Sequence, residues 1–235
     1  MTVPKLPSPV ISPGMAVLGG RMRSAAWLSF IVLMAGLLSA PVHAQTPDDD
    51  LRIYSVSFNN SVSFIWPFSG YGVYLGRGTI LTAAHVAGRW SILASPRIVI
   101  AGQELPGKII KKGSFPDMDL ALLSIDETSL PLRVRLRLNP LCKTPPNFGA
   151  SVVVVYPDRT VRSRLISPKS VAPQYRTKFN TLIGEKQVSG SGIFDAERRC
   201  LLGIMSAAVR RVDSHGQNAD AGYFVPASVI AKFMP

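Results

Sequence analysis

The sequence predicts an all-β protein with one short helix at its C-terminus. After residue 50 the chain is a succession of short apolar or alternating runs, separated by Gly, Pro, Asn and Asp. No long segment has the period of an amphipathic helix until residues 226–234. No internal repeat or low-complexity tract of the mature chain competes with this interpretation.

The predicted strands follow one another from residue 71 onward. They cover residues 71–75, 79–82, 97–101, 120–125, 151–156, 161–166, 192–195, 201–206 and 222–225. The first two are joined by Gly76-Arg77-Gly78, where glycine accepts the positive φ of a tight hairpin. In the C-terminal segment, Pro226 suits the first turn of a helix, and Val229, Ile230 and Phe233 share one face. We expect this helix to dock that face on the domain.

Residues 1–44 have the organisation of a signal peptide. Two arginines precede the apolar run 25–40, and Ala44 ends a small-residue stretch that suits cleavage. Cleavage there would make the protein periplasmic or secreted, and an uncleaved membrane anchor is the alternative. The leader is long, so translation could instead start at Met15 or Met22.

The chain is strongly basic, with 26 Lys and Arg against 14 Asp and Glu and a formal net charge of +12. Loss of the leader would remove three basic residues and no acidic ones, which leaves +9. The alternation of Arg133, Arg135 and Arg137 predicts one face of a strand, with a possible weak attraction to anionic envelope surfaces. No aromatic residues interleave with these arginines, which argues against specific nucleic-acid binding.

The two cysteines, Cys142 and Cys200, could form a disulfide after export, and two buried free thiols are the alternative. Neither lies where a nucleophile is expected. Cys142 belongs to the Pro-rich segment 140–146, which is a natural boundary between two halves of the domain. The scattered cysteines and histidines match no common metal-ligand spacing, and no cofactor motif is present, so we expect no metal and no cofactor.

One histidine and one aspartate beside strand-like runs suit acid–base chemistry. His85 follows an apolar run that ends in small residues, whereas His215 lies in a turn-like segment and is expected to be exposed. Asp119 precedes an apolar run that would hold its carboxylate at a fixed depth, and Asp117 follows a loop-like segment instead. Histidine can accept a proton near neutral pH, and a carboxylate can orient it.

The candidate nucleophile is a serine in the segment Ser189-Gly190-Ser191-Gly192-Ile193-Phe194-Asp195. Its glycines permit a tight loop and the close backbone approach that an oxyanion hole requires. Both serines are candidates on local composition, and the apolar residues that follow them must decide the register.

Three segments together resemble the trypsin-like (chymotrypsin-fold) serine peptidases, in particular compact bacterial members. They are Thr82-Ala83-Ala84-His85, Asp119-Leu120-Ala121-Leu122-Leu123 and the serine segment above, in the family's order. The resemblance implies two Greek-key β-barrels packed with the active site between them. Within a peptidase domain at 45–235, the N-terminal barrel would cover about 51–139, the C-terminal barrel about 147–225 and the helix 226–234. The resemblance also favours Ser189 over Ser191 as the nucleophile.

The resemblance also implies catalytic roles. His85 would act as general base and then acid, Asp119 would orient it, and Ser189 would attack a peptide carbonyl. The N–H groups of Gln187 and Ser189 would stabilise the oxyanion. Gln187 departs from the family's usual glycine, and Val188 from its usual Asp or Asn.

The same resemblance implies a set of substrate-binding residues. The segment Ser206-Ala207-Ala208 would pair with the bound peptide. Ile183 would form the base of the pocket for the residue that precedes the cut, with Ala208 and Gly222 along its walls. No carboxylate is present there, so a neutral side chain is expected.

The sequence therefore predicts an exported serine endopeptidase that acts on polypeptides through an acyl-enzyme. Because of the two departures, the alternative is a catalytically impaired trypsin-fold protein that binds peptides or acts as a scaffold in the cell envelope.

Overall fold

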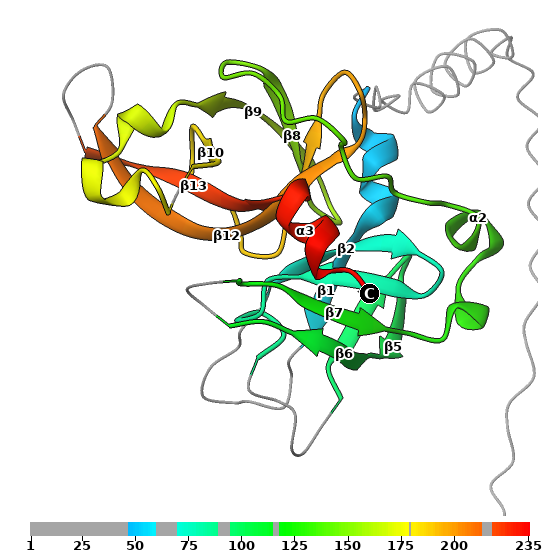
Figure 1. Cartoon of the computed structure of the whole chain (residues 1–235). Helices are drawn as coiled ribbons and strands as arrows, with labels where there is room; N and C mark the ends of the chain where they lie inside the picture. The colour runs from blue at the N-terminus through cyan, green and yellow to red at the C-terminus, as the bar shows by residue number, and fades with distance from the viewer. Residues whose placement is uncertain (1–46, 60–69, 89–94, 115–117, 179, 213–217) are drawn as a thin grey trace, which may run out of the picture. The chain divides into compact units, whose positions relative to one another are not determined.

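The computed structural model describes residues 47–59, 70–88, 95–114, 118–178, 180–212 and 218–235 (Figure 1). The described residues all belong to one compact unit, Gln45–Pro235. The expected signal peptide and His215 lie outside the described residues. Within the described ranges, no helix is both long and apolar enough to cross a membrane.

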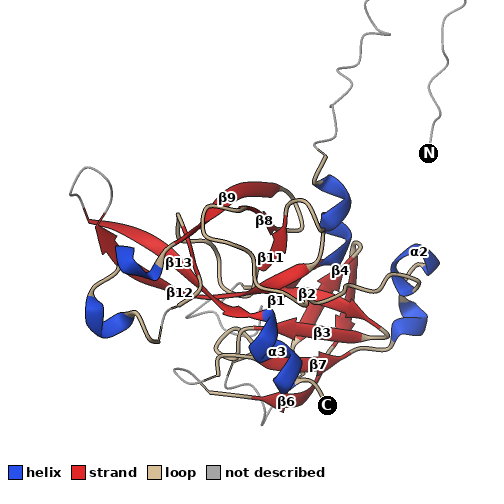
Figure 2. Cartoon of the chain, turned by 45° about the horizontal axis from the view of Figure 1, so that its top comes forward, coloured by secondary structure: helices blue, strands red, loops and turns tan. Residues whose placement is uncertain are grey.

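The N-terminal half is a seven-stranded antiparallel sheet that makes a half-barrel, in the order β5-β4-β1-β2-β3-β7-β6 (Figure 2). A 3-10 helix, η1 (Asp49–Tyr54), precedes it. Its strands are β1 (Ser55–Asn59), β2 (Tyr71–Gly76), β3 (Thr79–Thr82), β4 (Arg97–Ile100), β5 (Gln103–Pro106), β6 (Lys108–Lys112) and β7 (Ala121–Ser124). Alternate side chains such as Ile80 and Leu123 fill its interior.

The C-terminal half is a closed barrel of six strands in the order β10-β13-β12-β11-β8-β9. They are β8 (Ser151–Val155), β9 (Thr160–Ile166), β10 (Leu182–Ile183), β11 (Gly192–Asp195), β12 (Leu201–Val212) and β13 (Asn218–Pro226). The predicted all-β class, with a double-barrel architecture and a terminal helix, is confirmed.

The predicted strands at 79–82 and 192–195 have the observed bounds, and β12 and β13 are longer than predicted. β1, β5, β6 and β10 were not predicted. β5 and β6 lie at the two edges of their sheet and expose most of their side chains, so they carry no apolar run. β10 has only two residues.

The prediction of a strand face for Arg133, Arg135 and Arg137 is wrong. A helical turn, α2 (Leu132–Arg135), begins after Pro131, and only Val134 of this segment is buried. Short 3-10 helices lie in the connections between strands: η2 (Glu127–Ser129), η3 (Pro168–Ser170) and η4 (Pro173–Tyr175).

The terminal helix α3 (Ala227–Phe233) joins the two halves through one apolar cluster. Its Ile230 and Phe233 are buried, as predicted, and Val229 is partly buried against the same cluster. Leu122 from the first sheet and Phe194 from the barrel belong to it too. Burial of this apolar surface holds the two halves in one arrangement.

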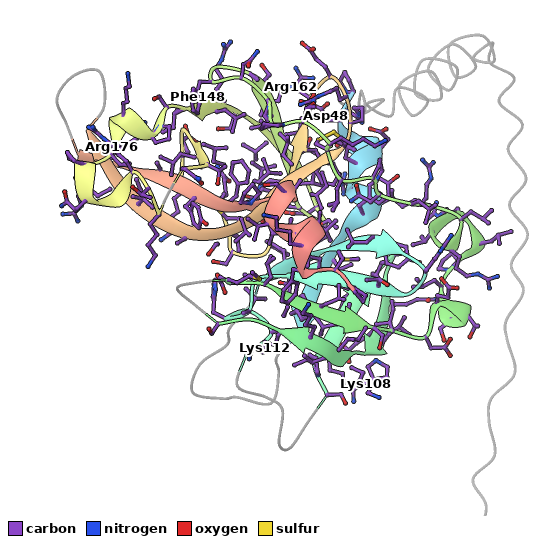
Figure 3. The ribbon with its side chains drawn as sticks, in the orientation of Figure 1. Asp48, Lys108, Lys112, Phe148, Arg162 and Arg176 are labelled. Atoms are coloured by element: carbon purple, nitrogen blue, oxygen red, sulfur yellow. A yellow bond between two sulfur atoms is a disulfide. The ribbon has the colours of Figure 1, made fainter. Side chains whose placement is uncertain are left out.

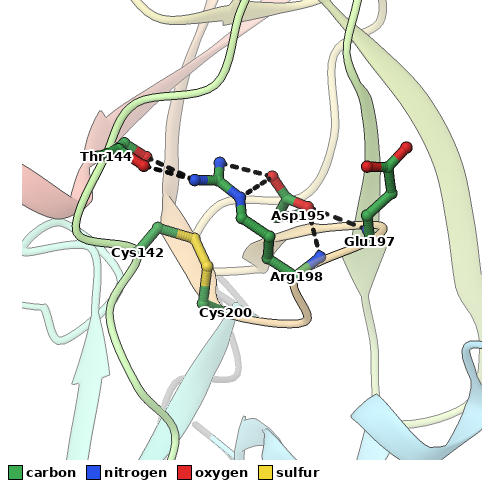
Figure 4. Close-up of a disulfide and its surroundings, with 6 residues drawn as sticks. All are labelled: Cys142, Thr144, Asp195, Glu197, Arg198 and Cys200. Carbon is green, nitrogen blue, oxygen red and sulfur yellow. Dashed lines mark hydrogen bonds and ion pairs between the residues drawn. A yellow bond between two sulfur atoms is a disulfide. The ribbon is translucent and has the colours of Figure 1, made fainter.

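The two cysteines form a disulfide, Cys142–Cys200, which ties the segment between the halves to the start of β12 (Figure 4). Beside it, the Arg198 guanidinium donates to both the Asp195 carboxylate, at 2.7 Å, and the Thr144 hydroxyl, at 2.7 Å. The disulfide and the Arg198–Thr144 hydrogen bond thus fasten the same connection.

The N-terminal end of the described chain is held by a buried carboxylate, Asp48. It accepts from Arg162 Nε of β9 at 2.7 Å (Figure 3). It also accepts from Arg199 at 2.8 Å. Arg199 also pairs with Asp50. A charge with little access to water depends on such partners, because its removal from water is costly.

We expect Asp48→Asn to lower the free energy of unfolding by about 2 kcal/mol, less than for a fully buried pair because Arg162 is exposed. The matched control is Asp158→Asn, which breaks an ion pair with Arg159 whose two members are both exposed and should change stability little. Urea unfolding measures both. Equal losses in the two variants would contradict the anchoring role of Asp48.

Candidate active site

The pairing of β3 with β7 brings His85 and Asp119 together. Thr82 lies opposite Ala121 in this antiparallel pair, so the residues just beyond that register meet at the same end of the sheet. The chain makes a helical turn after β3, in which Val86 N donates to Ala83 O. His85 Nδ1 then lies 2.7 Å from Asp119 Oδ2, and the His85 backbone N–H donates to Asp119 Oδ1 at 3.0 Å.

Asp119 is the most buried member of the site, with 2% of its side chain exposed. Burial alone would raise the pKa of its carboxyl, but hydrogen bonds from the His85 ring, the Ser206 hydroxyl and the His85 backbone outweigh it and leave the pKa below the ordinary value. Ser206 Oγ donates to Asp119 Oδ2 at 2.6 Å. The carboxylate therefore stays ionised and holds Nδ1 protonated, which leaves Nε2 free to accept a proton.

Ser189 lies in the loop between β10 and β11, which contacts both halves. Its carbonyl accepts from Tyr71 N of β2 at 3.0 Å, and Gly190 N donates to Met205 O of β12 at 2.8 Å. Ser189 Oγ donates to the Ser206 carbonyl at 3.3 Å. Among the described residues, this hydroxyl makes no hydrogen bond to the imidazole.

His85 and Ser189 line one open cavity of about 560 Å³. Its other lining residues are Gly70, Val86, Tyr156, Arg159, Lys186, Gln187 and Val188. Ser191, the competing serine, is fully buried and does not reach this cavity. The structure therefore brings the ring of His85 and the hydroxyl of Ser189 to the same solvent-accessible space.

Gln187 and Val188, the two residues that depart from the family pattern, both hydrogen-bond to Tyr156, which the sequence analysis did not single out. The Tyr156 hydroxyl donates to Gln187 Oε1. Burial raises the pKa of Tyr156, and a hydrogen bond from the Val188 backbone opposes that rise only in part. The phenol thus remains a donor at neutral pH. Gln187 does not have the positive φ that would favour glycine at its position.

Tyr156 gave no signal in the sequence because it ends an apolar run like any core residue. Its ring packs edge-on against Tyr71, with the centroids 5.4 Å apart. The hydroxyl of Ser206 was also missed, although its strand was singled out. A buried polar residue within the apolar run of β12 was the available sign.

The predicted substrate-binding residues fall in register across three neighbouring strands. Ile183 of β10 lies opposite Gly222 of β13, which lies opposite Ala208 of β12. Ile183 is fully buried, and a Cβ added at Gly222 would lie 3.0 Å from its Cγ1. Ala207 is partly exposed and Ala208 is exposed on the same strand. Among the described residues, no cluster of three or more His, Cys, Asp or Glu could hold a metal.

We expect Gly190→Ala to destabilise the protein far more than Gly149→Ala. Both glycines have a positive φ, of 84° and 86°, so the backbone strain of an added Cβ is matched. At Gly190 the new Cβ would lie 1.8 Å from Tyr71 O, whereas at Gly149 it would meet nothing within 4 Å. Gly149→Ala should cost about 1–2 kcal/mol.

Gly190→Ala should cost at least about 2 kcal/mol more, because backbone cannot rotate away from the overlap. Chemical denaturation of both variants checks this. Indistinguishable unfolding midpoints would show that the loop does not depend on close approach to Tyr71.

We expect Asp119→Asn to be less stable than the unmodified protein at neutral pH, by on the order of 2 kcal/mol. An acid whose pKa is lowered by folding stabilises the native state above its unfolded pKa, and this stabilisation is lost as pH falls through the folded value. The difference should therefore shrink below about pH 4. Urea unfolding at pH 7 and at pH 3 measures it, with exposed Glu185→Gln as the control. If the stability difference between the two proteins does not change with pH, the Asp119 carboxylate is not stabilised in its ionised form as the structure indicates.

No protein-family profile and no curated sequence matches the chain. Solved structures are similar to it. A kallikrein-related peptidase 10 in complex with Zn²⁺ has a TM-score of 0.56 at 20% identity, over 77% of this chain and 93% of that one. The Rv3671c protease of M. tuberculosis in its active form has a TM-score of 0.54 at 16% identity, over 93% and 92%.

The MamO protease domain from Magnetospirillum magneticum has a TM-score of 0.51 at 17% identity, over 79% of this chain and 97% of that one. At such identities the likeness concerns the fold. This chain therefore has the double-barrel fold of the trypsin-like serine proteases.

Proposed function

We propose that this protein is an exported serine endopeptidase that cleaves peptide bonds through an acyl-enzyme. One observation carries the proposal: the His85 imidazole, oriented by a buried and ionised Asp119, shares an open cavity with the Ser189 hydroxyl. The fold of the known serine proteases agrees with it. A base, its orienting carboxylate and an accessible hydroxyl are the groups that acyl transfer requires.

The reaction begins with a rotation of the Ser189 side chain from the Ser206 carbonyl towards His85 Nε2. The ring accepts the hydroxyl proton while Oγ attacks the carbonyl carbon of the scissile bond. Asp119 keeps the proton on Nδ1 and stabilises the imidazolium. The imidazolium then protonates the leaving amine, and water, activated by the same ring, hydrolyses the acyl-enzyme.

The oxyanion that forms on the substrate carbonyl needs two N–H donors near the nucleophile. Gln187 and Ser189 supply them in this proposal. Neither backbone N–H donates to another described residue, which supports their availability. Tyr156 holds the side chain of Gln187, so the loop that presents these donors is restrained before substrate binds.

The substrate is a polypeptide that lies along Ser206-Ala207-Ala208. In support of a neutral residue before the cut, Ile183, Gly222 and Ala208 lie opposite one another on neighbouring strands, and none of them is charged. The sequence of the leader supports export, and a disulfide between Cys142 and Cys200 is compatible with an oxidising compartment.

We expect a fluorophosphonate probe to label the purified protein and not Ser189→Ala. His85→Ala should label at least about a hundredfold more slowly, because general-base assistance contributes 10²–10⁴. Ser191→Ala is the matched control and should label normally if it folds. Intact-mass spectrometry measures the adduct, and circular dichroism checks folding. Labelling that survives Ser189→Ala and is lost in Ser191→Ala would assign the other serine.

A second candidate function is peptide binding without catalysis. Its supporting observations are the Gln187 side chain at a position where the family has glycine, and the Ser189 hydroxyl bonded to Ser206 O. A folded protein that binds peptides but gives no adduct, and remains unlabelled as Gln187→Gly, would favour this function.

A further inference from the structure

An exposed segment of alternating leucine and arginine, residues 132–138, has no role in the site. We call it the Leu–Arg segment. Leu132, Leu136 and Leu138 are 60%, 73% and 57% exposed, although large aliphatic side chains are normally covered. α2, where the segment begins, lies at the periphery of the described chain (Figures 1 and 2).

The geometry of the segment places the leucines together and the arginines around them. Leu132 and Leu136 are four residues apart on a helical turn, closed by Leu136 N donating to Leu132 O at 3.0 Å, so they share one face. Arg133 and Arg135 project on either side of that face. Val134 points the other way and is fully buried in the core of the first sheet.

The segment is also held firmly from beneath. Besides the Val134 anchor, Asn139 N donates to Leu75 O of β2 at 3.2 Å, and the Leu138 carbonyl accepts from the Tyr54 hydroxyl at 3.4 Å. The leucines are therefore presented by a fixed backbone, and their exposure does not result from a free chain end.

The three arginines of the segment form no ion pair with any described residue. Of the two acids that precede the segment, Asp126 accepts from Thr128 at 2.7 Å, and Glu127 interacts with the Tyr74 hydroxyl, on which Arg135 also acts electrostatically. This contrasts with Arg162, Arg198 and Arg199, which all pair with carboxylates. The segment thus presents three arginines that form no ion pair with a described residue, around an apolar centre.

We propose that the Leu–Arg segment docks the protein on an anionic lipid bilayer. The arginines would bind lipid phosphates while the leucines enter the boundary between headgroups and acyl chains, as in interfacial helices. A protein partner fits less well, because the segment has no aromatic anchor of the kind that dominates such interfaces. Other large exposed apolar residues of the described chain, Ile110, Phe148 and Val188, lie far apart in the sequence.

Docking by this segment leaves the candidate active site open, since none of its residues lines the cavity with His85 and Ser189. A catalytically inactive chain would bind the same bilayer, because docking uses no residue of that cavity.

The test uses protein recovered from the soluble fraction after export, mixed with vesicles of phosphatidylglycerol and phosphatidylcholine or of phosphatidylcholine alone. Sedimentation measures the bound fraction. Arg133→Gln/Arg135→Gln/Arg137→Gln should weaken binding to anionic vesicles on the order of 100-fold. Leu132→Ser/Leu136→Ser/Leu138→Ser should weaken it about tenfold or more.

The matched control removes three exposed positive charges elsewhere, in Lys143→Gln/Arg164→Gln/Lys169→Gln. It should lose far less affinity than the segment's arginine variant. Equal losses would show that net charge alone acts, and unchanged binding of the leucine variant would show that no side chain inserts. Either result overturns the proposal, as does binding of this segment to another protein when the unmodified chain does not bind vesicles. Circular dichroism confirms that each variant is folded.

Discussion

The arrangement around the Asp119 carboxylate is the constraint on which the site depends. It is buried where the two halves meet, and its partners come from both of them: the ring and backbone of His85 after β3, and the hydroxyl of Ser206 on β12. These donors keep the carboxylate ionised in spite of burial. The same Ser206 accepts, through its carbonyl, from the Ser189 hydroxyl. One buried charge therefore sets the tautomer of the base and lies two hydrogen bonds from the candidate nucleophile.

The loop that carries Ser189 is restrained by close packing as much as by hydrogen bonds. Gly190 lies so near the Tyr71 carbonyl that no other residue fits, and the Ser189 carbonyl is held by Tyr71 N. Tyr156 packs against that same Tyr71 ring and binds Gln187. This chain thus uses a tyrosine pair to restrain a segment in which it departs from the usual glycine. Preorganisation of this kind would lower the cost of aligning N–H donors in the proposed reaction.

Much of the fold was predictable because the buried strands carry continuous apolar runs. β3 and β11 were predicted with their observed bounds, and β8 was predicted from its continuous apolar run, whereas the double barrel was implied by the family resemblance. The edge strands β5 and β6 were not predicted, because strands with mostly exposed side chains have no continuous apolar run. The alternation at Arg133, Arg135 and Arg137 predicted a strand, but alternation shows only that apolar and charged residues take turns. Whether an apolar residue of this segment is buried depends on what packs against it, and here only Val134 is buried.

By itself, the sequence determined the all-β class, the segments that carry His85, Asp119 and Ser189, and the flexibility that Gly190 and Gly192 allow, because each depends on local residue type and period. Tertiary structure decided the rest. It excluded Ser191 from the cavity by burying it, joined Cys142 to Cys200, recruited the Ser206 hydroxyl to Asp119 and set Tyr156 on Gln187. These relations link residues distant in sequence, and their distances are fixed only when two sheets pack together and exclude water between them.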